Sequence, residues 1–251
     1  MKDVRVLENA EAVSRQVAAD FVECAREAVA RRGGFTVALS GGSTPRRLYQ
    51  ILAEAPYREA VEWSRVEFFW GDERAVPPDH PDSNYGMAAG ALLDELGVRP
   101  AQIHRMEAER RDVGAAALDY QREIARVLGA DPEALPPAYD LILLGLGADG
   151  HTASLFPWSP ALPERRRWVV VHFVPKLKAD RMTLTAPIIN RAREIRMLVA
   201  GADKAAALAE VLEGPPEPER LPAQLIRPEA GRLVWLVDRA AAARLGAAAR
   251  P

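Results

Sequence analysis

The chain has 251 residues, of which 49% are hydrophobic and 27% are charged, and its formal net charge is −2. This is the composition of an ordinary globular protein with enough apolar residues for a full core. Lysine and arginine are scattered among aspartate and glutamate, which argues against nucleic acid as a partner. The sequence contains neither a run of about 18 apolar residues nor an N-terminal apolar stretch typical of a signal peptide. We therefore expect a cytoplasmic protein.

Short apolar runs alternate with helix-forming segments along the chain. The first helix is expected over residues 11–32, which contain the single cysteine, Cys24. A lone cysteine can form neither an intramolecular disulfide nor a metal clip, so we interpret it as a small buried side chain. The predicted strands are residues 35–39, 66–70, 139–146, 168–173, 195–200 and 233–237. The further predicted helices are residues 46–53, 85–96, 113–128, 204–212 and 240–249.

Several predicted strands are apolar at almost every position, which favours a parallel sheet covered by helices on both faces. The segments between them are rich in alanine, leucine, arginine and glutamate, which are strong helix formers. Because the proline-rich stretches are too short for linkers, the alternation predicts a single α/β domain over residues 1–251. In such sheets ligands bind at the carboxyl ends of the strands, so the loops after strands carry the functional signal.

The first such loop contains the sequence Ser-Gly-Gly-Ser-Thr-Pro. Gly41 and Gly42 permit positive φ angles and a close approach of a ligand to the backbone. With Thr44 as N-cap and Pro45 at the first helical position, free N–H groups and the helix dipole favour an anion, and Ser43 adds a hydroxyl. The loop lacks the Walker A, Rossmann and nucleophile-elbow patterns. A phosphate cradle and a simple capped turn stand as equal alternatives.

The second loop, residues 70–85, follows a strand that ends in aromatic residues. Its three prolines stiffen it, so that it can hold side chains still. Arg74 can bind phosphate or carboxylate oxygens through its guanidinium fork, and Asp72 can orient a base or bind sugar hydroxyls. The alternative is a solvated turn of three consecutive charges. We expect His80 to lie at the surface.

The third loop, residues 145–157, carries an aspartate and a histidine around a glycine. Histidine titrates near neutral pH, so His151 can take a proton from water and return it. Asp149 can orient the ring and stabilise its cationic form. The alternative is a loop histidine with a structural hydrogen bond. No third ligand with metal-site spacing is present, so the pattern predicts a catalytic base and no metal site.

Four segments together resemble the 6-phosphogluconolactonase family, which is related to the glucosamine-6-phosphate deaminases and isomerases. They are LSGGSTPRRLY (residues 39–49), FFWGDERAVPPDHPDSNYGMA (68–88), LLGLGADGHTASLFP (143–157) and RMTLTAPIIN (181–190). Their order and spacing match across most of the chain. The resemblance implies a NagB-like fold, a Rossmann-type mostly parallel sheet, and hydrolysis of the 6-phosphogluconolactone ring without metal or cofactor.

The resemblance also implies roles for individual residues. Those implied around the sugar phosphate are Gly41, Gly42, Ser43, Thr44, Arg74, Arg181 and, by likeness to the deaminases, Lys204. His151 matches the histidine that activates water, and Asp72 and Asp149 match acidic residues near the sugar, either of which can orient that histidine. Backbone donors at or near Gly147 are expected to face the oxyanion.

Two other functions stay open. One is a deaminase-like isomerase acting on glucosamine 6-phosphate; there the pattern after Asp-Gly-His is Ile-Ala-Phe-Asn-Glu-Pro, whereas residues 152–157 here read Thr-Ala-Ser-Leu-Phe-Pro, the lactonase pattern. The other is a non-catalytic sugar-phosphate sensor. Residues 174–180 depart from the family's proline-rich form, which leaves the roles of Lys176 and Lys178 open. We expect a small-molecule lactone as substrate, no membrane partner, and a monomer or small homo-oligomer.

Overall fold

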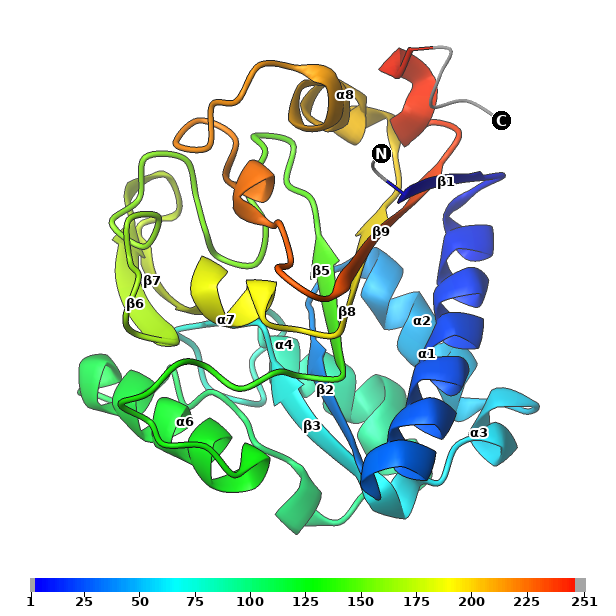
Figure 1. The fold of residues 1–251 in the computed structure, drawn as a ribbon, viewed down its shortest axis with the longest axis vertical. Coiled ribbons are helices and arrows are strands. Elements are labelled where there is room, and N and C mark those ends of the chain that lie inside the picture. The colour runs from blue at the N-terminus through cyan, green and yellow to red at the C-terminus, as the bar shows by residue number, and fades with distance from the viewer. Residues whose placement is uncertain (1–2, 247–251) are drawn as a thin grey trace.

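A computed structural model describes residues 3–246, which form a six-stranded parallel sheet and a three-stranded antiparallel sheet (Figure 1). The large sheet has the order β1–β9–β8–β5–β2–β3, and every neighbouring pair in it is parallel. Its strands are β1 (Asp3–Leu7), β2 (Phe35–Leu39), β3 (Val66–Trp70), β5 (Leu141–Gly145), β8 (Glu194–Val199) and β9 (Arg232–Asp238). The small sheet has the order β4–β7–β6, with β4 (Asp72–Arg74), β6 (Val169–Val174) and β7 (Ala179–Leu184).

Helices cover both faces of the large sheet. They are α1 (Ala10–Arg32), α2 (Ser43–Ala53), α3 (Tyr57–Ala60), α4 (Asn84–Ala88), α5 (Asp94–Leu96), α6 (Val113–Leu128), α7 (Ala186–Asn190) and α8 (Ala205–Glu213). Helix α1 begins where the Asn9 side chain accepts a hydrogen bond from the Ala12 N–H, and it ends at Gly33, whose φ is 78°. In Figure 1, α1 and α2 lie on one side of the large sheet, and α6 and the small sheet lie on the other.

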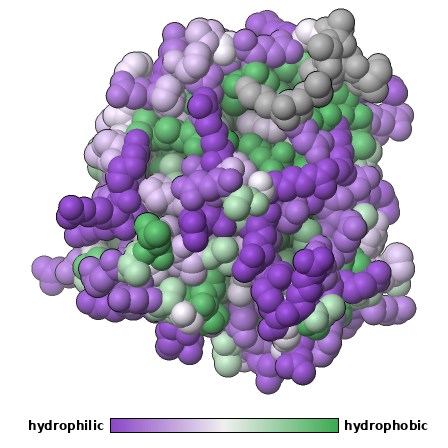
Figure 2. All heavy atoms as spheres, in the orientation of Figure 1, coloured by the Kyte–Doolittle hydropathy of each residue, from purple (hydrophilic) through white to green (hydrophobic). Residues whose placement is uncertain are grey.

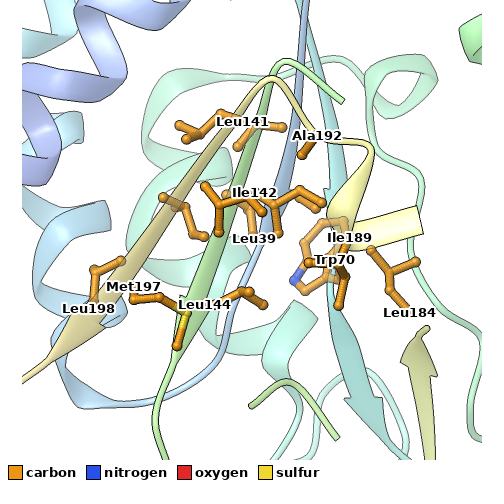
Figure 3. Close-up of a cluster of buried hydrophobic side chains, with 14 of the residues drawn as sticks. Leu39, Trp70, Leu141, Ile142, Leu144, Leu184, Ile189, Ala192, Met197 and Leu198 are labelled. Atoms are coloured by element: carbon orange, nitrogen blue, oxygen red, sulfur yellow. The ribbon is translucent and has the colours of Figure 1, made fainter. Parts of the chain in front are cut away.

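The central strands are buried on both faces. In β5, residues 141–144 are each at most 1% exposed. Figure 3 shows Ile142 and Leu144 of this strand in a layer of aliphatic side chains, with Trp70, Leu184 and Ile189 beside it. Because Leu184 belongs to β7 and Ile189 to α7, one continuous core packs the small sheet against the large one.

The two sheets join at Gly71, where the chain leaves β3 and enters β4. The Gly71 N–H donates to the carbonyl oxygen of Leu39 at 2.8 Å, and the Gly71 carbonyl accepts from the N–H of Leu184 at 2.8 Å. This residue therefore contacts the end of β2 and the end of β7 at once. The polar side chains of the small sheet are thereby placed beside the loop that follows β2.

The predicted α/β class with a parallel sheet is confirmed, but several elements differ. Helices α3 and α7 were not predicted, and the helix predicted over residues 85–96 is divided into α4, a π-helical segment over Ala89–Leu93 and α5. The strand predicted at residues 168–173 exists, but it pairs antiparallel with β7 in the small sheet. Strands β1, β4 and β7 were not predicted, because they are short or interrupted by charged residues. The segment at 240–249 forms only a 3₁₀ turn over Ala241–Arg244, and residues 247–249 lie outside the described part.

Figure 2 shows a largely hydrophilic face, with hydrophobic residues gathered in its upper half. Within residues 3–246, none of the helices has the length and apolar content needed to cross a bilayer. Cys24, interpreted as a buried side chain, is only partly buried against the core, and this burial raises the pKa of its thiol to about 12. His80 is exposed, also as expected.

Candidate active site

The loops that follow β2, β3, β5 and β8 lie at one edge of the large sheet. These strands are parallel, and β8, β5, β2 and β3 are consecutive neighbours, so their carboxyl ends meet there. The small sheet begins at the same edge, directly after β3. The predicted site residues are thereby collected from segments far apart in the sequence.

Asp149 and His151 are in direct contact. Oδ1 of Asp149 lies 2.5 Å from Nδ1 of His151, and Oδ2 lies 3.2 Å from Nζ of Lys176. The hydrogen bond from His151 is the main effect that holds the pKa of the Asp149 carboxyl well below its usual range. The ionised carboxylate fixes Nδ1 of His151 as the protonated nitrogen. Within the described part of the chain, Nε2 of His151 has no hydrogen-bond partner.

The imidazole of His151 is held in place by packing as well as by the carboxylate. It stacks on Phe156 with 4.3 Å between ring centroids and 28° between planes, and 29% of the side chain is exposed. A Cβ at position 147 would lie 2.0 Å from Nδ1 of His151, so only glycine leaves room for the ring. The Gly147 N–H donates to the His151 carbonyl at 2.8 Å. The Gly147 N–H is thus engaged within the loop, and the expectation of oxyanion donors at Gly147 or its neighbours stays a prediction.

Asp72 does not contact His151 but lies buried in a separate polar network. Its Oδ2 accepts from the hydroxyl of Ser154 at 2.6 Å. The side-chain amide of Asn84 donates to the backbone oxygen of Asp72 at 2.8 Å and to its Oδ1 at 3.3 Å. The Ser154 N–H donates in turn to Oγ1 of Thr183 at 3.2 Å. Of the two carboxylates expected to orient the histidine, Asp149 does so, and Asp72 instead ties β4 to the loop after β5.

Arg74 and Arg181 lie directly opposite each other in the β4–β7 ladder, so their side chains share one face of the small sheet. Arg74 donates to the backbone oxygen of Asp82 at 2.5 Å, and Arg181 donates to that of Asp180 at 3.1 Å. In the described residues neither guanidinium has a carboxylate within ion-pair distance. Partial burial and the neighbouring Arg74 lower the pKa of Arg181. An unneutralised pair of like charges attracts an anion.

The loop after β2 differs in detail from its prediction. Helix α2 begins at Ser43 with Gly42 as N-cap, so Thr44 is not the cap and Pro45 is the third helical residue, not the first. The φ of 107° at Gly42 allows the helix to begin two residues earlier than predicted. Proline is tolerated at the third position because an N–H there would have no intrahelical acceptor. The N–H groups of Ser43 and Thr44 likewise have none.

Gly41 brings this loop against the small sheet. A Cβ there would lie 1.8 Å from Oδ1 of Asn84, so glycine permits the close approach of that side chain. Asn84 also donates to Asp72, and therefore links the loop after β2 to β4. Lys204 lies in a 3₁₀ turn over Ala202–Lys204, before α8 rather than within it, and its ammonium pairs with Asp203 at 3.0 Å.

A family model described as glucosamine-6-phosphate isomerases/6-phosphogluconolactonase matches residues 8–235. The chain belongs to this family. A 6-phosphogluconolactonase of Synechocystis sp. is 46% identical over 219 residues, which cover 87% of this chain and 88% of the relative. A 6-phosphogluconolactonase structure from Trypanosoma cruzi has a TM-score of 0.85 at 31% identity and covers 98% of this chain and 97% of its own.

The fold alone does not separate the two branches of the family. A monomeric glucosamine-6-phosphate deaminase of the NagB superfamily has a TM-score of 0.80 at 22% identity, with 97% of this chain and 100% of the other covered. The NagB-like fold and the family implied by the four segments are confirmed.

Sequence reasoning missed the role of Glu73, which holds together the loop over residues 70–85. Its two oxygens accept from the N–H groups of Arg74, Asn84 and Tyr85 and from the hydroxyl of Ser83. Burial raises the pKa of Glu73, and these backbone donors oppose the shift. Three of the four partners lie 10 to 12 positions further along the chain, so no local pattern marks this glutamate.

Proposed function

We propose that the chain hydrolyses 6-phospho-D-glucono-1,5-lactone to 6-phospho-D-gluconate, the second step of the oxidative pentose phosphate pathway, and that residues 1–251 act as a single domain. Relatives carrying that enzyme name match most of the chain. The observation that carries the proposal is His151, whose Nδ1 is held by Asp149 while Nε2 has no partner among the described residues. A histidine in this state is prepared to accept a proton.

The lactone is an activated ester, so its hydrolysis needs a water molecule at C1 and a proton acceptor. Because Asp149 binds Nδ1, the neutral tautomer of His151 carries its lone pair on Nε2. Nε2 takes a proton from water as the oxygen adds to C1. The resulting imidazolium, stabilised by Asp149, returns that proton to the ring oxygen as the C1–O bond breaks. One water molecule is consumed, and the histidine regains its starting state.

The phosphate is held away from the reacting carbon. Arg74 and Arg181 supply two adjacent positive charges, and the first turn of α2 supplies the N–H groups of Ser43 and Thr44 together with the helix dipole. Lys204 is a further cation at the same edge of the sheet. Binding energy from this remote group positions the lactone ring over His151 without taking part in the chemistry.

Hydrolysis is favoured over deamination by the residue at position 156. The deaminase pattern has a glutamate at this position, whereas here Phe156 covers one face of the His151 ring at 4.3 Å between centroids. An apolar ring at this place packs the base and supplies no second carboxylate for proton transfer on an amino sugar.

The test compares two substrates on the same preparation. Freshly generated 6-phosphoglucono-1,5-lactone is supplied and the acid released above the spontaneous rate is followed; ammonia release from glucosamine 6-phosphate is measured in parallel. We expect enzyme-dependent hydrolysis of the lactone and no ammonia. Ammonia release without acceleration of lactone hydrolysis would overturn the proposal in favour of the deaminase branch.

A further inference from the structure

Lys176 approaches the site from an element distant in sequence from Asp149 and His151. It lies in a 3₁₀ turn over Pro175–Leu177, at the tip of the hairpin that joins β6 to β7. The turn is closed by a hydrogen bond from the Lys178 N–H to the Pro175 carbonyl at 3.2 Å. From this tip Nζ of Lys176 reaches Oδ2 of Asp149 at 3.2 Å, although 73% of the lysine side chain is exposed.

Asp149 is therefore shared between two partners, His151 and Lys176. Oδ1 binds the ring and, at 3.4 Å, the backbone N–H of His151, while Oδ2 binds Lys176. With both oxygens engaged, rotation of the carboxylate costs at least one contact. The hairpin thus fixes the plane of the carboxylate from outside, and the carboxylate fixes the ring.

We propose that Lys176 is a positioning residue for the reaction, which holds the Asp149 carboxylate in line with His151 and weakens the stabilisation that this carboxylate gives to the imidazolium. This inference rests on the proposed role of His151 as the base. It assigns a function to a residue of the hairpin, a segment in which the sequence departs from the pattern of its family.

The groups around the His151 ring determine its electrostatic environment. The charged group in contact with His151 on its own loop is Asp149, and the charged group that the β6–β7 hairpin adds is Lys176. Phe156 covers one ring face without charge, and His172 of β6 lies beyond it, with 6.3 Å between the Phe156 and His172 centroids.

The other cations of this edge of the sheet hydrogen-bond elsewhere: Arg74 and Arg181 with backbone oxygens, and Lys204 with Asp203. A carboxylate alone stabilises imidazolium, and an ammonium on its second oxygen weakens that stabilisation. The contact of Lys176 with Oδ2 therefore opposes the charge of Asp149 at the ring, and removal of this contact is expected to favour the imidazolium.

The matched control lies two residues away. Lys178 is an exposed lysine of the same hairpin, and its ammonium has no partner among residues 3–246. Lys176→Met and Lys178→Met remove the same charge from the same tip and keep an unbranched side chain. Only the first removes the contact with Asp149. Lys176→Arg restores a cation that can reach the carboxylate.

The experiment measures the protonation of His151 in two ways. The first is an NMR titration of the imidazole in the full chain, with the His151 signals assigned by comparison with His151→Gln. The second is the pH profile of kcat/KM for the lactone, corrected for spontaneous hydrolysis. We expect Lys176→Met to raise both the NMR midpoint and the acid limb of the kcat/KM profile by about half a pH unit. The shift is small because the ion pair between Lys176 and Asp149 is partly solvated. Lys178→Met is expected to leave both within about 0.1 unit, and Lys176→Arg to restore the wild-type midpoint.

The outcomes separate this inference from the proposed function. An NMR midpoint that rises in Lys176→Met alone supports the effect of Lys176 on the imidazole. If the wild type nevertheless fails to hydrolyse the lactone, the proposed function is overturned, and with it the role of Lys176 in that reaction. Equal midpoints in the two methionine variants, with wild-type hydrolysis intact, would overturn the role of Lys176. A raised KM in Lys176→Met with an unmoved midpoint would also overturn it, because Lys176 would then act on the substrate.

Discussion

His104 and His151 each contact carboxylates, yet their surroundings differ. The side chain of His104 is 4% exposed; Nε2 lies 2.8 Å from Glu67 and Nδ1 lies 2.7 Å from Glu123. The side chain of His151 is 29% exposed, and within residues 3–246 only its Nδ1 has a hydrogen-bond partner, Asp149. Both rings stack on a phenylalanine, with centroid distances of 4.5 Å at His104 and 4.3 Å at His151.

The difference shows what distinguishes a structural histidine from a base. His104 ties β3 to α6 through Glu67 and Glu123, and neither of its nitrogens is left for a proton from water. His151 has the same type of carboxylate contact and the same stacking, but keeps one nitrogen free on a partly exposed loop. The free nitrogen at the carboxyl edge of the sheet, rather than the carboxylate partner, marks the candidate base.

The largest expected effect comes from the carboxylate on His151. Asp149→Asn removes the acceptor that fixes the tautomer and the charge that stabilises the imidazolium, so kcat is expected to fall by about 10²–10⁴-fold. Glu123→Gln makes the corresponding change at His104 and is expected to leave kcat within about threefold, because His104 takes no part in the chemistry. Steady-state lactone hydrolysis by both variants checks this; equal losses would remove the distinction between the two histidines.

The second largest effect is expected at Gly147, which leaves space for the ring of His151. In Gly147→Ala the new Cβ would lie 2.0 Å from Nδ1 of His151, and displacement of the base is expected to lower kcat by about 10²-fold. Gly145→Ala is the control, since a Cβ there meets nothing within 4 Å. An unchanged kcat in Gly147→Ala would show that the ring position seen here is not the productive one.

The loop of Asp149, His151 and Gly147 also shows how much of the site can be predicted from sequence. Asp149 and His151 are two positions apart, so their contact follows from local chemistry, and the glycine-rich pattern marked the loop. The role of Gly147 did not follow, because whether its N–H points to a ligand or to the His151 carbonyl depends on the course of the loop. Lys176 and Ser154 reach the site through contacts across 27 and 82 positions, which no local pattern encodes.

In the fold, too, elements with a local sequence pattern were predicted, and elements that depend on long-range contacts were not. Strands with continuous apolar runs, such as β2 and β5, were predicted because burial on both faces leaves that pattern. Strand β4 was assigned to a loop because Asp72, Glu73 and Arg74 are consecutively charged. Their partners in β7 and in residues 83–85 lie far along the chain, and these contacts make the segment a strand.

A smaller effect is expected at the structural histidine, and on stability rather than activity. His104→Leu removes two partly buried hydrogen bonds that tie β3 to α6, so the free energy of unfolding is expected to fall by about 1–3 kcal/mol, with kcat unchanged. His151→Leu, at a partly exposed site, is expected to change it by about 0.5 kcal/mol or less. Urea unfolding of both variants measures this; a greater loss of stability at His151 would reverse the comparison.

The smallest effect concerns the phosphate. Arg181→Met removes one charge of the Arg74–Arg181 pair, and KM for the phosphorylated lactone is expected to rise about tenfold with little change in kcat. Arg166→Met, at an exposed arginine away from the ladder, serves as control. The KM for unphosphorylated gluconolactone is expected to stay unchanged in both variants, and an equal rise for both substrates would contradict the assignment of Arg181 to the phosphate.

The most direct test of the central claim measures kcat for 6-phosphoglucono-1,5-lactone in the wild type, His151→Asn and His104→Asn, each corrected for spontaneous hydrolysis. The account predicts rapid turnover by the wild type, a loss of about 10²–10⁴-fold in His151→Asn, and near wild-type kcat in the folded fraction of His104→Asn. Full activity in His151→Asn would contradict the account, because the base would then have to be another residue.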